Sequence, residues 1–181
     1  MMKMGRISDR RMSSITDAYE TTIKLVENEM VRKDSKNNTY IGVKFGSSVG
    51  DTMQHLACFA PGMFILDDLT ENDALGFELA KTCFGLYNMT GSKLSGDDHY
   101  FGGSEGMRVK DSIWPGRPET VESLFVAYRR TNDTKYQDWV WQTFEAIQKH
   151  AKVEHGYATV RNVESNRTTT DDTMESFMMA E

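Results

Sequence analysis

The chain has 181 residues, a formal net charge of −6 and 39% hydrophobic residues, which is a composition typical of one globular domain with a real core. It has no basic stripe, since the densest basic spots are only Arg10-Arg11 and Arg129-Arg130, and this argues against a nucleic-acid partner. No apolar run approaches the roughly 18 residues of a membrane span. No signal peptide is visible after Met1, so the chain is either cytosolic or lacks its natural beginning.

The first half of the chain alternates between helical and extended patterns. Apolar residues recur at helical spacing over 15–32 and again over 72–88, so both segments are expected to be helices. Residues 40–45 have the pattern of a short strand. Residues 53–66 are largely apolar and are expected to form a buried helix that Pro61-Gly62 interrupts.

The second half opens with a glycine-rich stretch, 90–114, which has no period and is expected to be a long loop with one hairpin. Helical spacing returns over 118–130 and 135–150, and 156–160 is expected to be a strand. The recurring unit of helix, loop, helix and short strand favours a helical array or toroid.

The C-terminal segment 172–181 begins like a helix and stops after about two turns. It has no C-cap glycine and no cationic last turn. We therefore expect that the chain is truncated there.

The segment 116–125 places an arginine and two acids at the opening of one amphipathic helix. Pro118 suits the first helical position, where its missing N–H costs nothing. Glu119 and Glu122 lie three residues apart and share one face of the first turn, where the helix dipole favours ionised carboxylates. Acids in a first turn are also ordinary capping chemistry. Taken alone, the pattern leaves both a ligand site with Arg117 and a plain helix start open.

The two cysteines, Cys58 and Cys83, are too few for a zinc site, which needs four ligands in paired short spacings. In an intracellular protein they would be two buried free thiols. Four N-glycosylation tripeptides favour a glycosylating, oxidising lumen instead. Their acceptor residues are Asn37, Asn88, Asn132 and Asn166.

Four separated blocks of the sequence resemble the class I α-1,2-mannosidases, glycoside hydrolase family 47. They are 53–59 (MQHLACF), 117–123 (RPETVES), 135–139 (KYQDW), and 174–177 (MESF) together with 180–181 (AE). Their order and spacing match the family as well, so the resemblance extends from about residue 17 to the end. It implies a mainly all-α fold, part of an (α/α)7 toroid with short β-hairpin elements. Residues 17–181 would be the C-terminal part of a catalytic domain truncated at both ends, after a leader, 1–16, of unassigned role.

The resemblance implies inverting hydrolysis of terminal α-1,2-linked mannose from high-mannose N-glycans, with Ca²⁺ as cofactor. Inversion requires two carboxyl groups far enough apart to admit a water. The family's general acid is expected upstream of Met1, and its calcium-binding threonine downstream of Glu181. Glu119 and Glu122 would then hold Ca²⁺ only through water. We therefore expect the segment alone to be inactive. The alternatives are a non-catalytic mannose-glycan-binding or chaperone-like remnant of such an enzyme, and a soluble helical protein with no glycan role.

The resemblance also assigns roles to single residues. Glu119 matches the general base, Arg117 an arginine that contacts substrate, and His55 a histidine lining the pit. Without the resemblance, His55 in its apolar segment would be read as a core histidine. Phe177 matches the aromatic on which the mannose ring stacks, and Glu181 a glutamate that binds its hydroxyls. Since Phe177 and Glu181 are four residues apart, they are expected to share one helical face.

Some positions fall outside the family pattern. A leucine usually precedes the Arg-Pro-Glu triplet, where this chain has Gly116. A Leu-Gly-Pro-Glu segment of the family stands here as 94–97 (LSGD), and Val140 replaces a family glycine. The remaining histidines match no motif and are expected at the surface: His99, His150 and His155.

Cys58 and Cys83 coincide with the pair that forms a disulfide in the endoplasmic reticulum and Golgi mannosidases of the family. This implies a place in the secretory pathway, in the ER or Golgi lumen, with a full-length form anchored to the membrane by an N-terminal segment absent here. The block 55–59 leans towards the Golgi type, whereas 120–123 and 174–176 lean towards the ER type. The choice between the two stays open.

Overall fold

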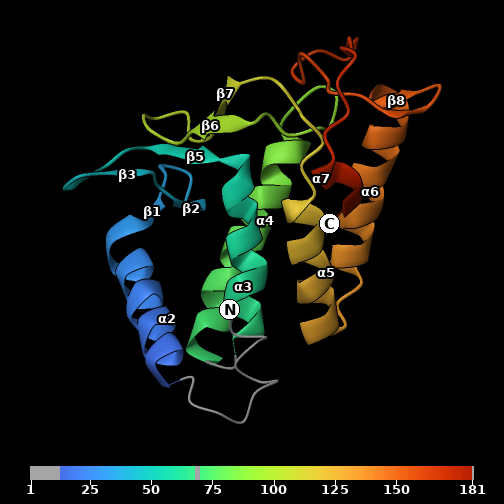
Figure 1. Cartoon of the computed structure of the whole chain (residues 1–181). Helices are drawn as coiled ribbons and strands as arrows, with labels where there is room; N and C mark the ends of the chain where they lie inside the picture. Colours follow the sequence, from blue (N-terminus) through green and yellow to red (C-terminus); the bar gives the residue numbers. More distant parts are fainter. Residues whose placement is uncertain (1–12, 68–69, 181) are drawn as a thin grey trace.

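The computed structural model describes residues 13–67 and 70–180 of the chain (Figure 1). Its α-helices are α2 (Ser13–Leu25), α3 (Ala60–Leu66), α4 (Thr70–Asn88), α5 (Glu119–Thr131), α6 (Lys135–His150) and α7 (Phe177–Ala180). A π-helical turn, η1 (Val26–Met30), follows α2, and a 3₁₀ helix, η2 (His55–Phe59), precedes α3. Of the expected leader, residues 1–12 lie outside the described residues.

The strands are short, and every pair among the described residues is antiparallel. β5, β6 and β7 form a three-stranded sheet, while β1-β2, β3-β4 and β8-β9 form separate pairs. Their bounds are β1 (Val31–Lys33), β2 (Thr39–Ile41), β3 (Lys44–Phe45), β4 (Ser48–Val49), β5 (Thr52–Gln54), β6 (Asp98–Tyr100), β7 (Arg108–Asp111), β8 (Lys152–Val153) and β9 (Gly156–Tyr157).

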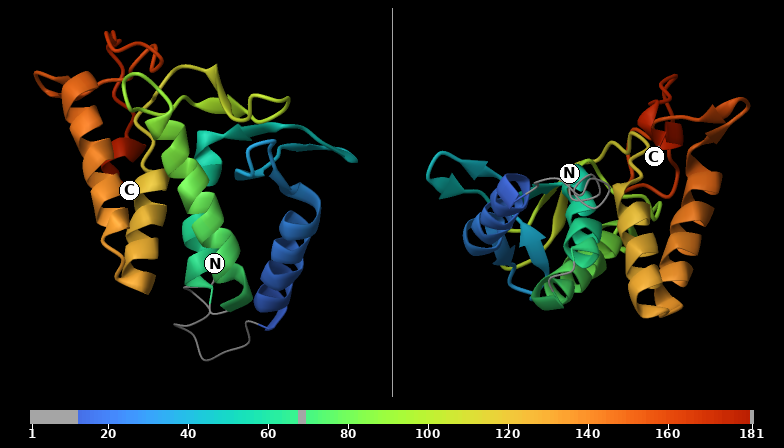
Figure 2. Two further views of the ribbon diagram at one scale, coloured as in Figure 1. Left: turned by 180° about the vertical axis from the view of Figure 1, so that it is seen from behind. Right: turned by 60° about the horizontal axis from the view of Figure 1, so that its bottom comes forward.

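The helices run side by side, and the strands gather at one end of them (Figures 1 and 2). The mainly helical fold with small hairpins confirms the expected class. None of the helices in the described part of the chain is long and apolar enough to span a bilayer.

Helix α4 is the centre of the core. Its predicted apolar stripe is confirmed, because Leu79, Cys83 and Leu86 are fully buried in one cluster with Phe64 of α3. Another side of α4 presents Ala80 to a cluster that contains Leu124, Ala127 and Tyr136 of α5 and α6. Burial of these apolar side chains holds α5 against α3 and α4 and thereby fixes where the start of α5 lies.

The expected single helix over 53–66 is wrong in its first part. Met53 belongs to β5, where it pairs with His99 of β6 and is buried. The 3₁₀ helix η2 follows, and α3 begins at Ala60. Pro61 lies in the first turn of α3, where a proline costs no intrahelical hydrogen bond, so it does not interrupt the helix.

The segments 15–32 and 40–45 also divide differently from the prediction. The α-helix ends at Leu25, and the chain passes through η1 into β1. The expected strand is split into β2 and β3 by Gly42, whose N–H donates to the Met30 carbonyl. A Cβ on Gly42 would lie 2.5 Å from the Gly50 carbonyl oxygen, so the close approach of these two backbone segments requires glycine.

The expected surface positions of two histidines are wrong. His99 is the central residue of β6, its side chain faces the core, and it is 0% exposed. His150 is 8% exposed, and its Nδ1 lies 3.0 Å from the Thr168 hydroxyl. His155 is exposed, as expected.

The helix expected from residue 172 is confined to α7, which begins at Phe177. The preceding residues are extended because they bond to a neighbouring segment: Thr159 N–H donates to the Thr173 carbonyl, and Asp171 N–H donates to the Thr159 carbonyl. These long-range hydrogen bonds override the local helical pattern.

Cys58 and Cys83 form a disulfide that joins η2 to α4, as the family resemblance implied. The bond closes a loop with a sequence separation of 25. We expect the double variant Cys58→Ala/Cys83→Ala to lose about 3 kcal/mol of unfolding free energy in urea, because the unfolded chain regains loop entropy. Two thiols that react with an alkylating agent in the native, unreduced protein would contradict the bond.

Candidate active site

The loop before α5 is shaped by Gly116. This residue has φ +89°, in the left-handed region that favours glycine, and a Cβ there would lie 3.1 Å from the Met178 sulfur. The departure from the family's leucine therefore has a structural basis. Helix α5 begins at Glu119, one residue later than predicted, with Pro118 as its N-cap.

Arg117 is held in place by a forked ion pair. Its Nε lies 2.5 Å from Asp97 Oδ1 and its Nη2 lies 3.3 Å from Asp97 Oδ2, and these hydrogen bonds raise the pKa of the guanidinium. Its Nη1 is 3.8 Å from Glu119 Oε1. The guanidinium carbon also lies 5.6 Å from the centre of the Phe177 ring, within cation–π range. One fixed cation thus connects an acid in the loop, an acid of α5 and an aromatic ring of α7.

The two acidic side chains in the first turn of α5 line one pocket, called the hollow below. Glu119 and Glu122 line a pocket of about 740 Å³ together with the apolar side chains of Leu56, Phe59 and Phe125. Glu119 is only 5% exposed, whereas Glu122 is half-buried. The predicted shared face is confirmed, and the two carboxylates meet a space large enough for a sugar.

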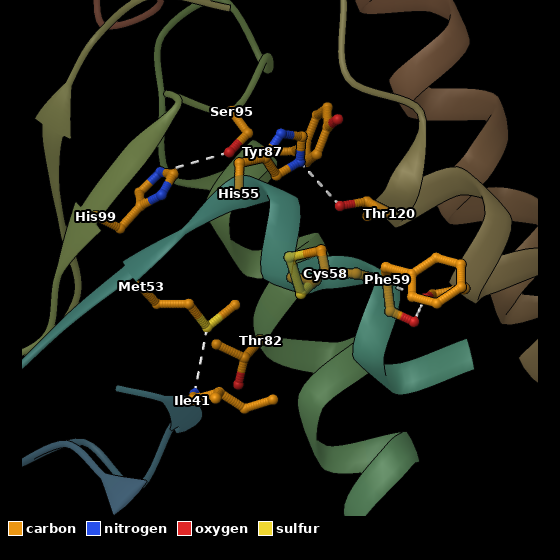
Figure 3. Close-up of a disulfide and its surroundings, with 12 residues drawn as sticks. Ile41, Met53, His55, Cys58, Phe59, Thr82, Tyr87, Ser95, His99 and Thr120 are labelled. Atoms are coloured by element: carbon orange, nitrogen blue, oxygen red, sulfur yellow. Dashed lines mark hydrogen bonds between the residues drawn. A yellow bond between two sulfur atoms is a disulfide. The ribbon is translucent and has the colours of Figure 1, made fainter. Parts of the chain in front are cut away.

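His55 lies beneath this turn and not on the wall of the hollow. It is 0% exposed, its Nε2 lies 3.0 Å from the Thr120 hydroxyl, and its ring meets the Tyr87 ring edge-on at 5.3 Å. Figure 3 shows the His55 ring next to the Tyr87 ring, with its hydrogen bond to Thr120 as a dashed line. In this chain the imidazole is therefore placed to support the start of α5.

The two buried histidines make the fold sensitive to acid. Burial lowers the pKa of His55 to about 3 and that of His99 to about 4, from an ordinary value of 6.5. Between pH 6.5 and these values the folded chain binds fewer protons than the unfolded chain. The unfolding free energy must then fall as the pH falls, on the order of 1.4 kcal/mol per pH unit for each histidine.

We expect the urea midpoint to drop when the pH is lowered from 7 to 5, and the variant His99→Gln to reduce that drop. His155→Gln is the matched surface control, because the His155 side chain is 88% exposed. An unchanged pH dependence in His99→Gln would show that His99 titrates normally in the folded protein.

Ser123 of α5 forms hydrogen bonds to the backbone of η2 and α3. Its hydroxyl donates to the Cys58 carbonyl at 2.6 Å and accepts the Gly62 N–H at 2.9 Å. A Cβ on Gly62 would lie 3.1 Å from that hydroxyl oxygen, so the packing is tight. The disulfide anchors the same segment, and both contacts fix the direction in which α5 presents Glu119 and Glu122.

The C-terminal pair is described only in part. Phe177 is half-buried at the start of α7 and lies beside Arg117, and its predicted role in stacking on the sugar stays a prediction. Glu181 lies outside the described residues, so its predicted place on the same helical face stays a prediction.

Sequence reasoning missed three residues that organise this site. Asp97 fixes Arg117, Thr120 bonds His55, and Ser123 ties α5 to α3. Asp97 lies 20 positions before Arg117 in the chain, and no local pattern signals their pairing.

The arrangement suits a polar, hydroxyl-rich ligand: two carboxylates at a hollow, a fixed guanidinium and an aromatic ring close by. The family described as Glycosyl hydrolase family 47 matches residues 1–181, and the chain belongs to this family.

Its relatives are named α-1,2-mannosidases. The chain is 38% identical to a mannosyl-oligosaccharide 1,2-alpha-mannosidase of Arabidopsis thaliana, a match covering 91% of the chain and 30% of that protein. It is 36% identical to mannosyl-oligosaccharide 1,2-alpha-mannosidase IA of Sus scrofa, over 100% of the chain and 29% of that protein. The chain therefore spans about a third of the length of these relatives.

The fold agrees with this membership. The structure superposes on the alpha-1,2-mannosidase from Trichoderma reesei with a TM-score of 0.85 and 27% identity, covering 91% of this chain and 39% of that one. This agreement confirms that the described helices form part of the family's (α/α)7 fold.

Proposed function

We propose that this chain is part of an inverting α-1,2-mannosidase that removes terminal α-1,2-linked mannose from high-mannose N-glycans. The observation that carries the proposal is the opening of α5, where Glu119 stands beside Arg117 and faces a hollow shared with Glu122. Membership in the family and the names of the relatives give the reaction class.

Glu119 is proposed as the general base. A carboxylate at the hollow can take a proton from a water molecule while the water oxygen attacks C1 of the mannose and the glycosidic oxygen leaves from the opposite face. The leaving oxygen needs a separate acid, which is proposed to come from sequence outside these 181 residues. Thr120 and Ser123 anchor the turn that holds the Glu119 carboxylate.

Arg117, Phe177 and Glu181 are proposed to hold the sugar. The guanidinium is restrained by Asp97, so it can donate to hydroxyl oxygens without first losing side-chain freedom. The Phe177 ring offers an apolar face for the mannose ring. His55 is proposed to act through Thr120, because its own ring is covered.

Ca²⁺ is the proposed cofactor. Carboxylate oxygens are ligands that this hard cation prefers, and Glu119 and Glu122 bring them to one hollow, which fits a role as partners through water. Six to eight oxygens are needed, and the described residues contain no cluster of three or more His, Cys, Asp or Glu side chains suited to a metal. Other donors are therefore proposed to complete the shell. When bound, Ca²⁺ would supply positive charge that orients the sugar hydroxyls.

The proposed location is the lumen of the ER or Golgi, with the full-length form anchored in the membrane by an N-terminal segment outside this sequence. The disulfide supports this location, since such bonds persist in oxidising compartments. The names of the relatives support a place in glycoprotein processing.

The test is to graft residues 13–180 into the catalytic domain of a relative in place of the matching third, and to supply high-mannose N-glycans with and without Ca²⁺. We expect free mannose only with Ca²⁺. Binding of the glycan without release of mannose would favour the alternative, a mannose-binding remnant.

A further inference from the structure

The four N-glycosylation tripeptides are not equivalent in the folded chain. All four asparagines are exposed, so exposure alone does not distinguish them. The tripeptide also requires a hydroxyl two residues after the asparagine. We therefore compared whether each threonine hydroxyl forms a hydrogen bond within the folded chain. Such a bond gives the threonine a structural role that does not depend on glycosylation.

At three of the tripeptides the threonine has a structural task. The Thr39 hydroxyl donates to Glu78 Oε2 at 2.6 Å, and the Thr90 hydroxyl donates to the Leu94 carbonyl at 2.8 Å. The Thr168 hydroxyl lies 3.0 Å from Nδ1 of the buried His150. In each case the hydrogen bond gives the threonine a role in the fold, so its presence does not by itself indicate glycosylation.

The fourth tripeptide, Asn132-Asp133-Thr134, forms the turn between α5 and α6. Asn132 ends α5 in the left-handed conformation, with φ +57°, and its N–H donates to the Tyr128 carbonyl. Thr134 is the N-cap of α6 but makes no side-chain capping bond, and its backbone is already helical, with φ −63° and ψ −16°. Asp133 Oδ1 accepts the Lys135 N–H. Within residues 13–67 and 70–180, no hydrogen bond uses the Asn132 amide group or the Thr134 hydroxyl.

We propose that Asn132 carries an N-linked oligosaccharide. This inference depends on the lumenal location in the proposed function. The donor class is a lipid-pyrophosphate-linked oligosaccharide. Asn132 Nδ2 forms the new bond to C1 of the first sugar, the bond from C1 to the pyrophosphate oxygen breaks, and the amide proton passes to a base of the transferring enzyme. The lipid pyrophosphate is the leaving group.

The position of the turn is compatible with an active enzyme. Glu119 and Asn132 stand at opposite ends of α5, and with a rise of 1.5 Å per residue they are about 20 Å apart along the axis. Figure 1 shows this turn at the end of the helices away from the strands. A glycan on Asn132 would therefore extend into solvent without covering the hollow at Glu119.

The test directs the chain into the ER lumen with a signal sequence fused ahead of Met1, and compares gel mobility before and after enzymatic removal of N-glycans. We expect Asn132→Gly and Thr134→Ala each to lose one glycan. Glycine keeps the left-handed backbone, so a loss of folding does not confuse the result. Thr134→Ser keeps the acceptor hydroxyl and Thr131→Ser lies outside the tripeptide, so both should retain the glycan.

Peptide mapping identifies the site directly. An unmodified Asn132 in the lumenal chain would overturn the inference, whatever the state of the other three asparagines. If Asn132 is glycosylated in that chain but not in the protein made by its own cells, the site is correct and the lumenal location in the proposed function is wrong.

Discussion

Replacing Glu119 by glutamine in the grafted enzyme is expected to reduce mannose release by about 10²- to 10⁴-fold while leaving glycan binding intact. The amide keeps the shape of the side chain and one hydrogen-bonding oxygen, but it cannot take a proton from the attacking water. Initial rates of mannose release and glycan binding by calorimetry measure the two properties separately.

Glu145→Gln is the matched control, because Glu145 is an exposed acid of α6 that bonds Trp141 and lies outside the hollow. It should turn over at the parental rate. If Glu119→Gln also turned over near that rate, the assignment of the base would be wrong, and a carboxyl group outside this chain would be the better candidate.

Replacing Arg117 by alanine is expected to weaken substrate binding by about 10- to 100-fold, seen as a higher KM. A hydrogen bond to a charged group contributes on the order of 1.5–3 kcal/mol, and each 1.4 kcal/mol changes an equilibrium constant tenfold. Arg117 holds the sugar and moves no proton, so KM should change more than kcat.

Two further variants test whether the change in KM comes from the position of the Arg117 guanidinium. Asp97→Asn keeps the arginine but removes the charge that fixes it, and we expect a smaller rise in KM. Arg130→Ala removes the Arg130–Asp73 ion pair at the far end of α5 and should leave KM unchanged. A fall in kcat with KM unchanged in Arg117→Ala would contradict a sugar-holding role.

Local sequence patterns predicted the long helices well. The stripe of α4 and the periods of α5 and α6 are repeated over many residues, so their positions follow from spacing alone. The strand β5 (Thr52–Gln54) was missed because its pairing partner β6 lies more than 40 residues away in the sequence. Apolar residues there fit a buried helix and a buried strand equally, and only tertiary pairing decides between them.

The residues of the site also differ in how well the sequence predicts them. Glu119, Glu122 and Arg117 lie within six residues of one another, and the start of one helix brings them together. The partners that orient them come from distant segments: Asp97 from the loop before β6, and His55 from η2. The apolar neighbours of His55 fit a buried histidine, but its contacts could not be inferred from them, since Tyr87 and Thr120 come from α4 and α5.

The most direct test of the proposed mechanism is the anomeric configuration of the mannose that the grafted enzyme releases. Proton NMR measures it from the first seconds of the reaction. A base at Glu119 that activates water opposite the leaving group inverts the anomeric centre. We expect β-mannose to appear first and α-mannose to accumulate only by mutarotation. The appearance of α-mannose as the first product would contradict the inverting mechanism and the role assigned to Glu119.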